Sequence, residues 1–208
     1  MVNLLLHKIT GRLFRKPQRM RLVIVARTLS ESLPAYQARI PLAVKVLPPD
    51  VDETERCLAH IPPEHRPDIE RRVRHGHLCC VAEHNGQIIY VSWIAFKICY
   101  SYLLDREYEL ADDEAYWYGA YALSAFRGNG VHPAVGCYIL QLLKDRGCKR
   151  VLGFVEKENP AALHSVAKLG FKKVGLTGFI EVFGLRWYFH RDDGVFSALK
   201  RRNCWRKM

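Results

Sequence analysis

The residues best suited to chemistry lie in the stretch RGNGVH, residues 127–132, between a strand-like aromatic run and an apolar segment with helical spacing. A glycine turn that leads from a strand into a helix exposes backbone N–H groups at the positive end of the helix dipole. Proteins hold phosphate or pyrophosphate groups in this setting. Two glycines would also fit an ordinary turn, because glycine is the usual residue wherever φ is positive. The stretch is therefore either a plain turn or a phosphate-binding loop.

Two familiar phosphate motifs are excluded by the residues that follow the glycines. A Walker loop needs Lys and then Ser or Thr after its last glycine, but Gly130 is followed by Val131 and His132. A dinucleotide-binding fingerprint needs a third glycine at position 133, which is a proline.

Aromatic side chains gather in the sequence just before this loop. Alternate residues of a strand point to opposite faces, so some of these rings should pack in the core and others should line a groove. The sequence therefore predicts a roomy pocket with apolar walls and hydroxyl groups. The aromatic residues are Tyr100, Tyr102, Tyr108, Tyr116, Trp117, Tyr118 and Tyr121.

Hydrophobic periodicity and turn signals predict the elements that must position these residues. Strands are expected at 21–27, within 37–49, on both sides of Asn85-Gly86 in 77–96, and at 114–123, 150–156, 171–181 and 185–190. Helices are expected at 52–60, 63–75, 132–146 and 159–170. Residues 98–113 show no clean period and are expected to form a loop or irregular crossing. This order predicts an α/β (α+β) fold with one mixed, mostly antiparallel twisted sheet flanked by helices.

Two helix starts carry local signals. Asp52 is expected to be the N-cap of the first helix, with Glu55 three residues later as in a capping box. Asn159 is expected to cap the last helix, with Pro160 at its first position and Gly170 at its end.

Length and composition fit one domain, since 208 residues that are 49% hydrophobic can bury a sizeable core. The domain is expected at 21–190, between a basic extension at 1–20 and a basic tail at 191–208. Seven cysteines without a CxxC pair favour free thiols in a reducing compartment and no structural metal. No apolar run reaches the roughly 18 residues of a membrane span, so a cytoplasmic protein is expected.

The formal net charge of +11 is uneven, because the first acidic residue is Glu31 and seven Lys or Arg residues precede it. This pattern favours an anionic partner such as a lipid surface or nucleic acid. The N-terminal segment fits an amphipathic surface helix, or an element docked on the domain or on the second subunit of a homodimer. Its apolar stripe consists of Val2, Leu5, Leu6, Ile9 and Leu13.

Several segments together resemble the GNAT superfamily of acyl-CoA-dependent N-acyltransferases. The family pattern Arg/Gln-x-x-Gly-x-Gly/Ala is matched by residues 127–131, and its Asn-x-x-Ala...Lys-x-Gly-Phe segment by Asn159, Ala162, Lys168, Gly170 and Phe171. The order of elements is similar over about residues 40–190, while the specific motifs cover only 122–171.

The resemblance implies a GNAT-like fold, acetyl-CoA or another acyl-CoA as co-substrate, and an amine as acceptor. In the family the loop amides bind the coenzyme A pyrophosphate, and the helix after Asn159 lies along the pantetheine arm. The implied coenzyme-binding residues are Ala122, Leu123, Arg127, Gly128, Asn129, Gly130, Val131, His132, Asn159 and Ala162.

The chain departs from the family pattern at two places. His132 stands where the family has glycine or alanine, and it would either supply an imidazole donor or cap the helix, while Pro133 removes an amide. Val166 stands where many members have a tyrosine that protonates the departing thiolate.

For catalysis, the family uses a backbone N–H on the strand before the loop to polarise the thioester carbonyl, here at Tyr121 to Leu123, with Tyr121 as the candidate. A carboxylate near the start of that strand often serves as base, which makes Glu114 the first candidate and Asp113 the second. Both could equally be solvated charges.

These observations predict an N-acetyltransferase in which an amine attacks an acyl-CoA directly in a ternary complex. The alternative is a non-catalytic acyl-CoA-binding scaffold that docks on an anionic surface through its basic termini. The acceptor amine is not specified by any motif.

Overall fold

The computed structural model describes residues 17–183, 185–192 and 201–202. Its main sheet has eight strands, in the order β10 (Leu185–Asp192), β9 (Lys172–Val182), β1 (Gln18–Thr28), β8 (Arg150–Glu156), β7 (Glu114–Ala122), β4 (Gln87–Phe96), β3 (Leu78–His84) and β2 (Ala43–Val46). Neighbouring strands of this sheet run antiparallel, except for β7 and β8, which are parallel. The expected mixed, mostly antiparallel sheet is confirmed.

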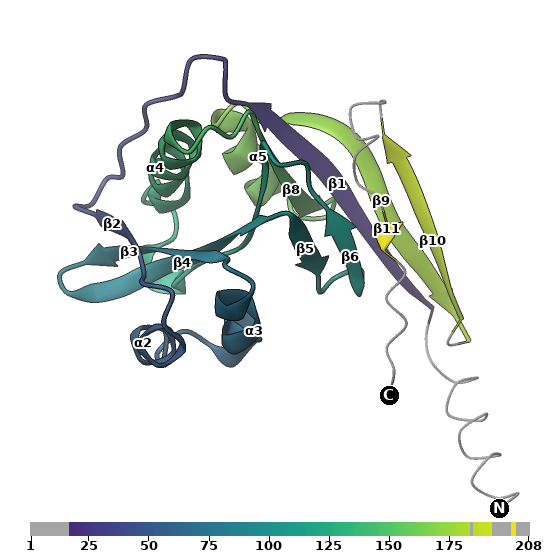
Figure 1. The fold of residues 1–208 in the computed structure, drawn as a ribbon, viewed down its shortest axis with the longest axis horizontal. Helices are drawn as coiled ribbons and strands as arrows, with labels where there is room; N and C mark the ends of the chain where they lie inside the picture. The colour runs from purple at the N-terminus through teal and green to yellow at the C-terminus, as the bar shows by residue number, and fades with distance from the viewer. Residues whose placement is uncertain (1–16, 184, 193–200, 203–208) are drawn as a thin grey trace, which may run out of the picture.

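Helices cover both faces of the sheet. The helices α4 (Val131–Asp145) and α5 (Pro160–Lys168) lie on one side, and α2 (Val51–Cys57) and α3 (Ile69–Arg74) lie on the other (Figure 1). Val135, Ile139 and Leu143 of α4 are fully buried against the first face, and Leu58, Ile61 and Ile69 are buried against the second. The strands β1, β9 and β10 extend together beyond the helical part (Figure 1).

Two local signals, the Asn85-Gly86 turn and the Asn159 cap, are confirmed. Asn85 and Gly86 have φ angles of 49° and 79°, which is the pair of positive values expected for the hairpin between β3 and β4. Asn159 caps α5, since its Oδ1 accepts the N–H of Ala162 at 3.0 Å. The strand and helix predictions around 114–123, 132–146, 150–156 and 159–170 are confirmed within one or two residues.

Three expectations were wrong. Residues 98–113 form the hairpin β5 (Ile98–Ser101) and β6 (Arg106–Glu109), which β11 (Arg201–Arg202) extends to a small second sheet. The predicted helix 63–75 is broken into a 3₁₀ turn, η1 (Pro63–His65), and α3, because Pro67 lacks an N–H donor and Asp68 has a φ of 52°. The N-cap of α2 is Asp50 and not Asp52, since the Asp50 carboxylate accepts the N–H of Glu53 at 2.7 Å.

The described cysteines, Cys57, Cys79, Cys80, Cys99, Cys137 and Cys148, are free thiols. Among the described residues, no helix combines the length and the apolar content that crossing a membrane requires. The predicted basic extension lies mostly outside the described residues, as does most of the predicted tail.

The position of the α2 cap can be tested by a pair of substitutions. Asp50→Ala should lower the free energy of unfolding by about 1 kcal/mol, because one N–H of the first helical turn loses its acceptor. Asp52→Ala, which removes a charge from the same turn but no cap, should have a smaller effect. Chemical denaturation of both variants measures the difference, and an equal or larger loss for Asp52→Ala would contradict the assignment.

Candidate active site

The parallel strands β7 and β8 pair only at their first residues. The register runs from Glu114 opposite Arg150 to Tyr116 opposite Leu152, and no pairing is made beyond it, although β7 continues to Ala122 and β8 to Glu156. Two parallel strands that stop pairing leave a wedge between them at their carboxyl ends. Ligands of sheets that contain parallel strands bind at such ends.

A β-bulge at Gly119 bends β7 where this wedge begins. Between the pairs Trp93–Tyr118 and Val91–Tyr121, β7 advances by three residues and β4 by two, so β7 carries an extra residue. Gly119 has a φ of 62°, which a residue with a side chain adopts only under strain.

A cavity of about 450 Å³ occupies the wedge. Gly119 and Ala120 of β7 and Phe154 to Glu156 of β8 form two of its walls. The other walls come from the 62–72 region, the β5–β6 hairpin and α5. The side chains that line the cavity include those of Glu64, His65, Arg72, Tyr100, Tyr102, Leu103, Tyr118, His132, Asn159, Ala162 and Val166.

The peptide group of Ala122 faces the wedge. Leu123 donates its N–H to the carbonyl of Ile89 on β4 at 2.9 Å, and alternate residues of a strand direct their peptide groups to opposite sides. The N–H groups of Tyr121 and Leu123 therefore point toward β4, whereas that of Ala122 points away from it. The Nε of Arg127 bonds to the Ala122 carbonyl at 3.1 Å from this open side. The N–H of Tyr121, the predicted backbone donor, is therefore directed toward β4, and the N–H of Ala122 is the one directed to the open side.

The glycine loop has the conformation that its two glycines predict. Gly128 and Gly130 have φ angles of 82° and 73°, and Gly130 is the N-cap residue of α4. The Asn129 side chain closes the loop by donating to the carbonyl of Phe126 at 3.2 Å, and the Asn129 carbonyl accepts the N–H of Arg39 at 2.8 Å. α4 has 15 residues and begins here without a side-chain cap. Pro133 has no N–H and Ala134 donates its own to the Gly130 carbonyl, so the N–H groups of Val131 and His132 are the ones in this turn without an intrahelical acceptor.

A shallow groove of about 380 Å³ runs over this loop. Gly128, Gly130 and Val131 form its floor, and Tyr36 and Gln37 of the segment before β2 form one side. Its charged side chains are cationic, namely Arg39, Arg127 and Lys168. Exposed His164 and half-buried Ser165 of α5 complete the groove. The groove thus offers positive charge together with helix N–H groups.

His132 lies between the groove and the cavity and lines both. Its ring stacks on Trp117 with a centroid distance of 4.9 Å, and its Nδ1 is 2.8 Å from the hydroxyl of Tyr90. Burial lowers its pKa to about 4, so the imidazole is neutral near pH 7. Since α4 has no side-chain cap, the interpretation of His132 as a helix cap is wrong.

The helix α5 borders the cavity with the residues that the sequence pattern indicated. Asn159 and Ala162 line the cavity at the start of the helix. Val166 is buried and also lines it, so this position offers an apolar wall and no hydroxyl. Gly170 ends the helix with a φ of 78°, and a Cβ there would lie 1.6 Å from the Arg27 side chain.

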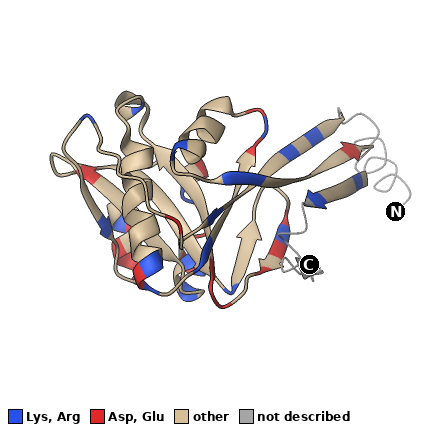
Figure 2. Cartoon of the chain, turned by 90° about the horizontal axis from the view of Figure 1, so that it is seen from above, with Lys and Arg blue, Asp and Glu red and all other residues tan. Residues whose placement is uncertain are grey.

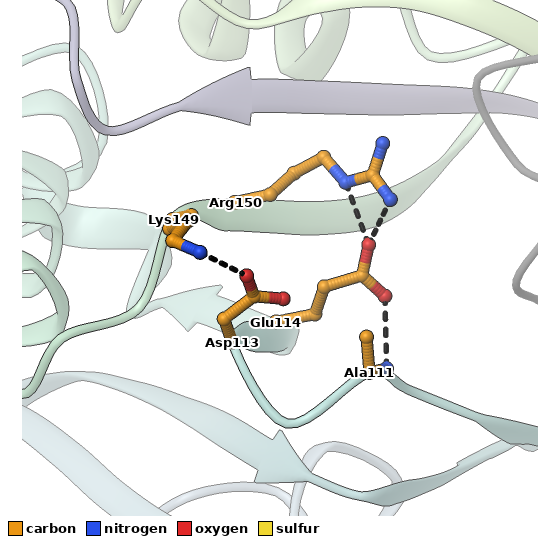
Figure 3. Close-up of polar contacts among 5 residues, drawn as sticks. All are labelled: Ala111, Asp113, Glu114, Lys149 and Arg150. Atoms are coloured by element: carbon orange, nitrogen blue, oxygen red, sulfur yellow. Dashed lines mark hydrogen bonds and ion pairs between the residues drawn. The ribbon is translucent and has the colours of Figure 1, made fainter.

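Glu114 is placed outside the cavity, in the paired part of β7 and β8 (Figure 3). It is 2% exposed, and its Oε1 accepts from the Arg150 Nε at 2.6 Å while its Oε2 accepts the Ala111 N–H at 3.1 Å. Asp113 pairs with Lys149 at 3.1 Å, which lowers the pKa of its carboxyl group. These contacts do not fit a base that takes a proton from an amine in the cavity.

Four polar residues of the cavity were missed by the sequence analysis. His65 stacks on the ring of Tyr121 with a centroid distance of 3.7 Å, and Glu64 and Glu156 are exposed at the rim. Arg72 is buried beside the bulge. Of these four, only Arg72 could have been found from the sequence. It lies three residues after the apolar residue Ile69, so helical spacing places both on the buried side of α3.

The comparisons with known proteins agree with this geometry. The model of the acetyltransferase (GNAT) family matches residues 49–171, more than half of the chain. The chain therefore belongs to the GNAT family. No curated protein matches the sequence.

Solved structures share the fold at low sequence identity. A GCN5-related N-acetyltransferase from Sphaerobacter thermophilus has a TM-score of 0.55 at 16% identity, over 90% of this chain and 56% of that one. A Drosophila protein has a TM-score of 0.54 at 11% identity, over 88% of this chain and 57% of that one. A GCN5-related N-acetyltransferase-like protein from Streptococcus suis has a TM-score of 0.51 at 16% identity, over 91% of this chain and 67% of that one. The chain spans a little over half of the length of the first two.

The role of Glu114 can be tested by Glu114→Gln. We expect the free energy of unfolding to fall by about 2 kcal/mol, because a buried charge-assisted hydrogen-bond pair is broken. The pH dependence of any acyl transfer should match that of the parent. Asp113→Asn, which removes the exposed neighbouring carboxylate, is the control and should have little effect on stability. A shifted pH–rate profile for Glu114→Gln would restore the catalytic interpretation.

Two half-buried histidines, His132 and His77, predict how stability depends on pH. Burial lowers the pKa of both His132 and His77 to about 4, whereas an imidazole in the unfolded chain titrates near 6.5. The unfolded state therefore binds more protons in this window, and stability should fall as the pH drops from about 6.5 to 4. Unfolding curves across this window should show a smaller slope for His132→Gln than for the parent. Replacing exposed His164 in the same way should leave the slope unchanged, and equal slopes for all three proteins would refute the assignment.

Proposed function

We propose that this protein transfers an acetyl or other acyl group from acyl-CoA to a primary amine, by direct attack of the amine within a ternary complex. The observation that carries the proposal is the wedge between β7 and β8, which joins a cationic groove at the N-terminus of α4 through His132. A long ligand with an anionic end and an apolar arm fits this continuous path.

The residues of the groove would hold the pyrophosphate of coenzyme A. Its negative charge suits the N–H groups at the start of α4 and the side chains of Arg39, Arg127 and Lys168. Gly128 leaves the loop backbone uncovered, since a Cβ there would meet no atom within 4 Å, whereas a Cβ at Gly130 would lie 3.6 Å from the Gln37 carbonyl oxygen. The pantetheine arm would then pass His132 and lie between β7 and α5, where the Ala122 peptide group is open to hydrogen bonding.

The bulge would serve the reacting carbonyl. Acyl-CoA supplies a thioester, whose oxygen gains negative charge as an amine attacks. A backbone N–H fixed at Ala120 or Ala122 would stabilise that charge, and such a donor needs no reorganisation during the reaction. The nitrogen forms a bond to the carbonyl carbon, the carbon–sulfur bond breaks, and coenzyme A leaves as its thiolate, which takes a proton from solvent.

A side chain of the cavity must accept the proton that the amine loses. We assign this role to His65, because imidazole is the group most often used for proton transfer near neutral pH and this ring lines the cavity close to the bulge. Glu64 and Glu156 at the rim would attract the cationic form of the amine. Val166 supplies no proton to the departing sulfur.

The distribution of charge over the described residues neither supports nor opposes the alternative of a non-catalytic acyl-CoA-binding scaffold. Lys and Arg occur on the long strands as well as on the helices, interspersed with Asp and Glu (Figure 2). The termini for which an anionic surface was predicted lie mostly outside the described residues, so docking through them stays a prediction, as does the cytoplasmic location.

Calorimetry with two ligands tests the proposed coenzyme site. Lys168→Met should weaken coenzyme A binding about tenfold, because a charge-assisted contact to phosphate is lost. Binding of pantetheine, which has no pyrophosphate, should be unchanged. Lys172→Met is the matched control, since Lys172 pairs with Glu31 outside the groove. Equal coenzyme A affinity of the parent and Lys168→Met, or no binding by the parent, would refute the groove assignment.

A further inference from the structure

Arg72 is a buried cation in the wall of the cavity. It is 3% exposed, and its Nε and Nη1 atoms have no hydrogen-bond partner within the part of the chain that the structure describes. A guanidinium group keeps its charge at any working pH and carries five N–H donors. Burying such a group is unfavourable unless it is paired and hydrogen-bonded. These unpaired donors mark a place for acceptor atoms of a ligand.

The surroundings of Arg72 compensate its charge only in part. Its guanidinium carbon lies 5.0 Å from the ring centre of Trp93, 5.1 Å from that of Tyr118 and 5.3 Å from that of Tyr102. Arg72 also has a side-chain hydrogen bond to the Tyr102 hydroxyl. Neither the ring faces nor this one hydroxyl provides an acceptor for Nε and Nη1.

The neighbouring arginines of α3 show what Arg72 lacks. Arg71 pairs with Glu107 at 2.9 Å, and Arg74 pairs with Glu70 at 2.6 Å. Arg72 has no carboxylate partner among the described residues. It lies between two arginines that are paired, and it is the one that faces the cavity.

The position of Arg72 relates it to the reaction. A Cβ at Gly119 would lie 3.6 Å from Nη1, so the guanidinium is beside the bulge of β7. The proposed acyl transfer places the thioester carbonyl along this strand. A group bound to Arg72 would therefore be only a few bonds away from the attacking nitrogen.

We propose that Arg72 binds the carboxylate of the acceptor, and that the acceptor is an amino acid or a similar amine with a carboxylate close to its nitrogen. This inference rests on the proposed acyl transfer and names its substrate class. Guanidinium matches carboxylate in charge and in hydrogen-bond geometry. Glu64 and Glu156 at the rim complement the ammonium group, and Tyr100, Tyr102 and Leu103 offer contacts to the remainder of the acceptor.

Matched acceptors test the inference on the unmodified protein. With saturating acetyl-CoA, free-thiol release is measured for the twenty amino acids, and phenylalanine is compared with phenethylamine and with phenylalanine amide. The last two compounds lack the carboxylate, and their amines are respectively more and less basic than that of phenylalanine. We expect at least one amino acid to be acylated with a kcat/KM about 100-fold above that of its amide and of its decarboxylated amine.

Variants of α3 test whether Arg72 carries this preference. Arg72→Met should reduce kcat/KM for the preferred amino acid to the level of its decarboxylated amine, with coenzyme A affinity unchanged. Arg74→Met removes an exposed charge from the same helix and should preserve the preference. Arg72→Lys keeps the charge but not the planar donor array, so it should show a reduced preference for acceptors with a carboxylate. This variant replaces Arg72→Met in the test if Arg72→Met does not fold.

The outcomes separate the inference from the function on which it rests. Equal turnover of acceptors with and without a carboxylate, or acylation only of amines that lack a carboxylate, overturns the role of Arg72 and leaves the acyl transfer intact. An equal loss for both acceptor types in Arg72→Met also overturns it. Absence of coenzyme A binding and of all thiol release overturns both.

Discussion

The separation of two parallel strands is the constraint on which this structure depends. β7 and β8 are hydrogen-bonded for three residues and then diverge, and the bulge at Gly119 fixes where β7 turns away. The ion pair of buried Glu114 and half-buried Arg150 links the strands at the closed end (Figure 3). The open end can then form a cavity in the middle of a continuous sheet, with backbone N–H groups along one wall. A sheet paired along its full length would have used those groups internally.

The polarity of the lining changes twice between the groove over the glycine loop and the far end of the cavity. The groove over the glycine loop is cationic, the passage at His132 is apolar and aromatic because burial keeps that imidazole neutral, and the far end of the cavity contains Arg72 among aromatic rings. This sequence of environments suits a ligand that is anionic at one end and apolar along its length. It also leaves a second cationic position for a different molecule. Two substrates can therefore be held at once without competing for the same charges.

The sequence predicted features that depend on neighbouring residues and missed those that depend on distant ones. The glycine loop, the Asn85-Gly86 hairpin and the Asn159 cap follow from local backbone requirements, and all were found. Glu114 looked like a free carboxylate because its partner, Arg150, is 36 residues away. The hairpin at 98–109 is an exception, because its two strands are neighbours in the sequence. It was missed because each strand has only four residues and their aromatic and acidic residues show no clean period. Arg72 and His65 reach the cavity only through the packing of α3 and η1 against the sheet, which no short motif encodes.

The central claim is that the wedge between β7 and β8 receives the acyl-bearing arm of coenzyme A. A crystal structure of the protein with coenzyme A tests it most directly. The account predicts the pyrophosphate over Gly128 and Gly130, the pantetheine arm hydrogen-bonded to the Ala122 peptide group, and the sulfur within the cavity near the bulge. A coenzyme bound elsewhere, or an arm that lies outside the wedge with the Ala122 N–H unused, would contradict it.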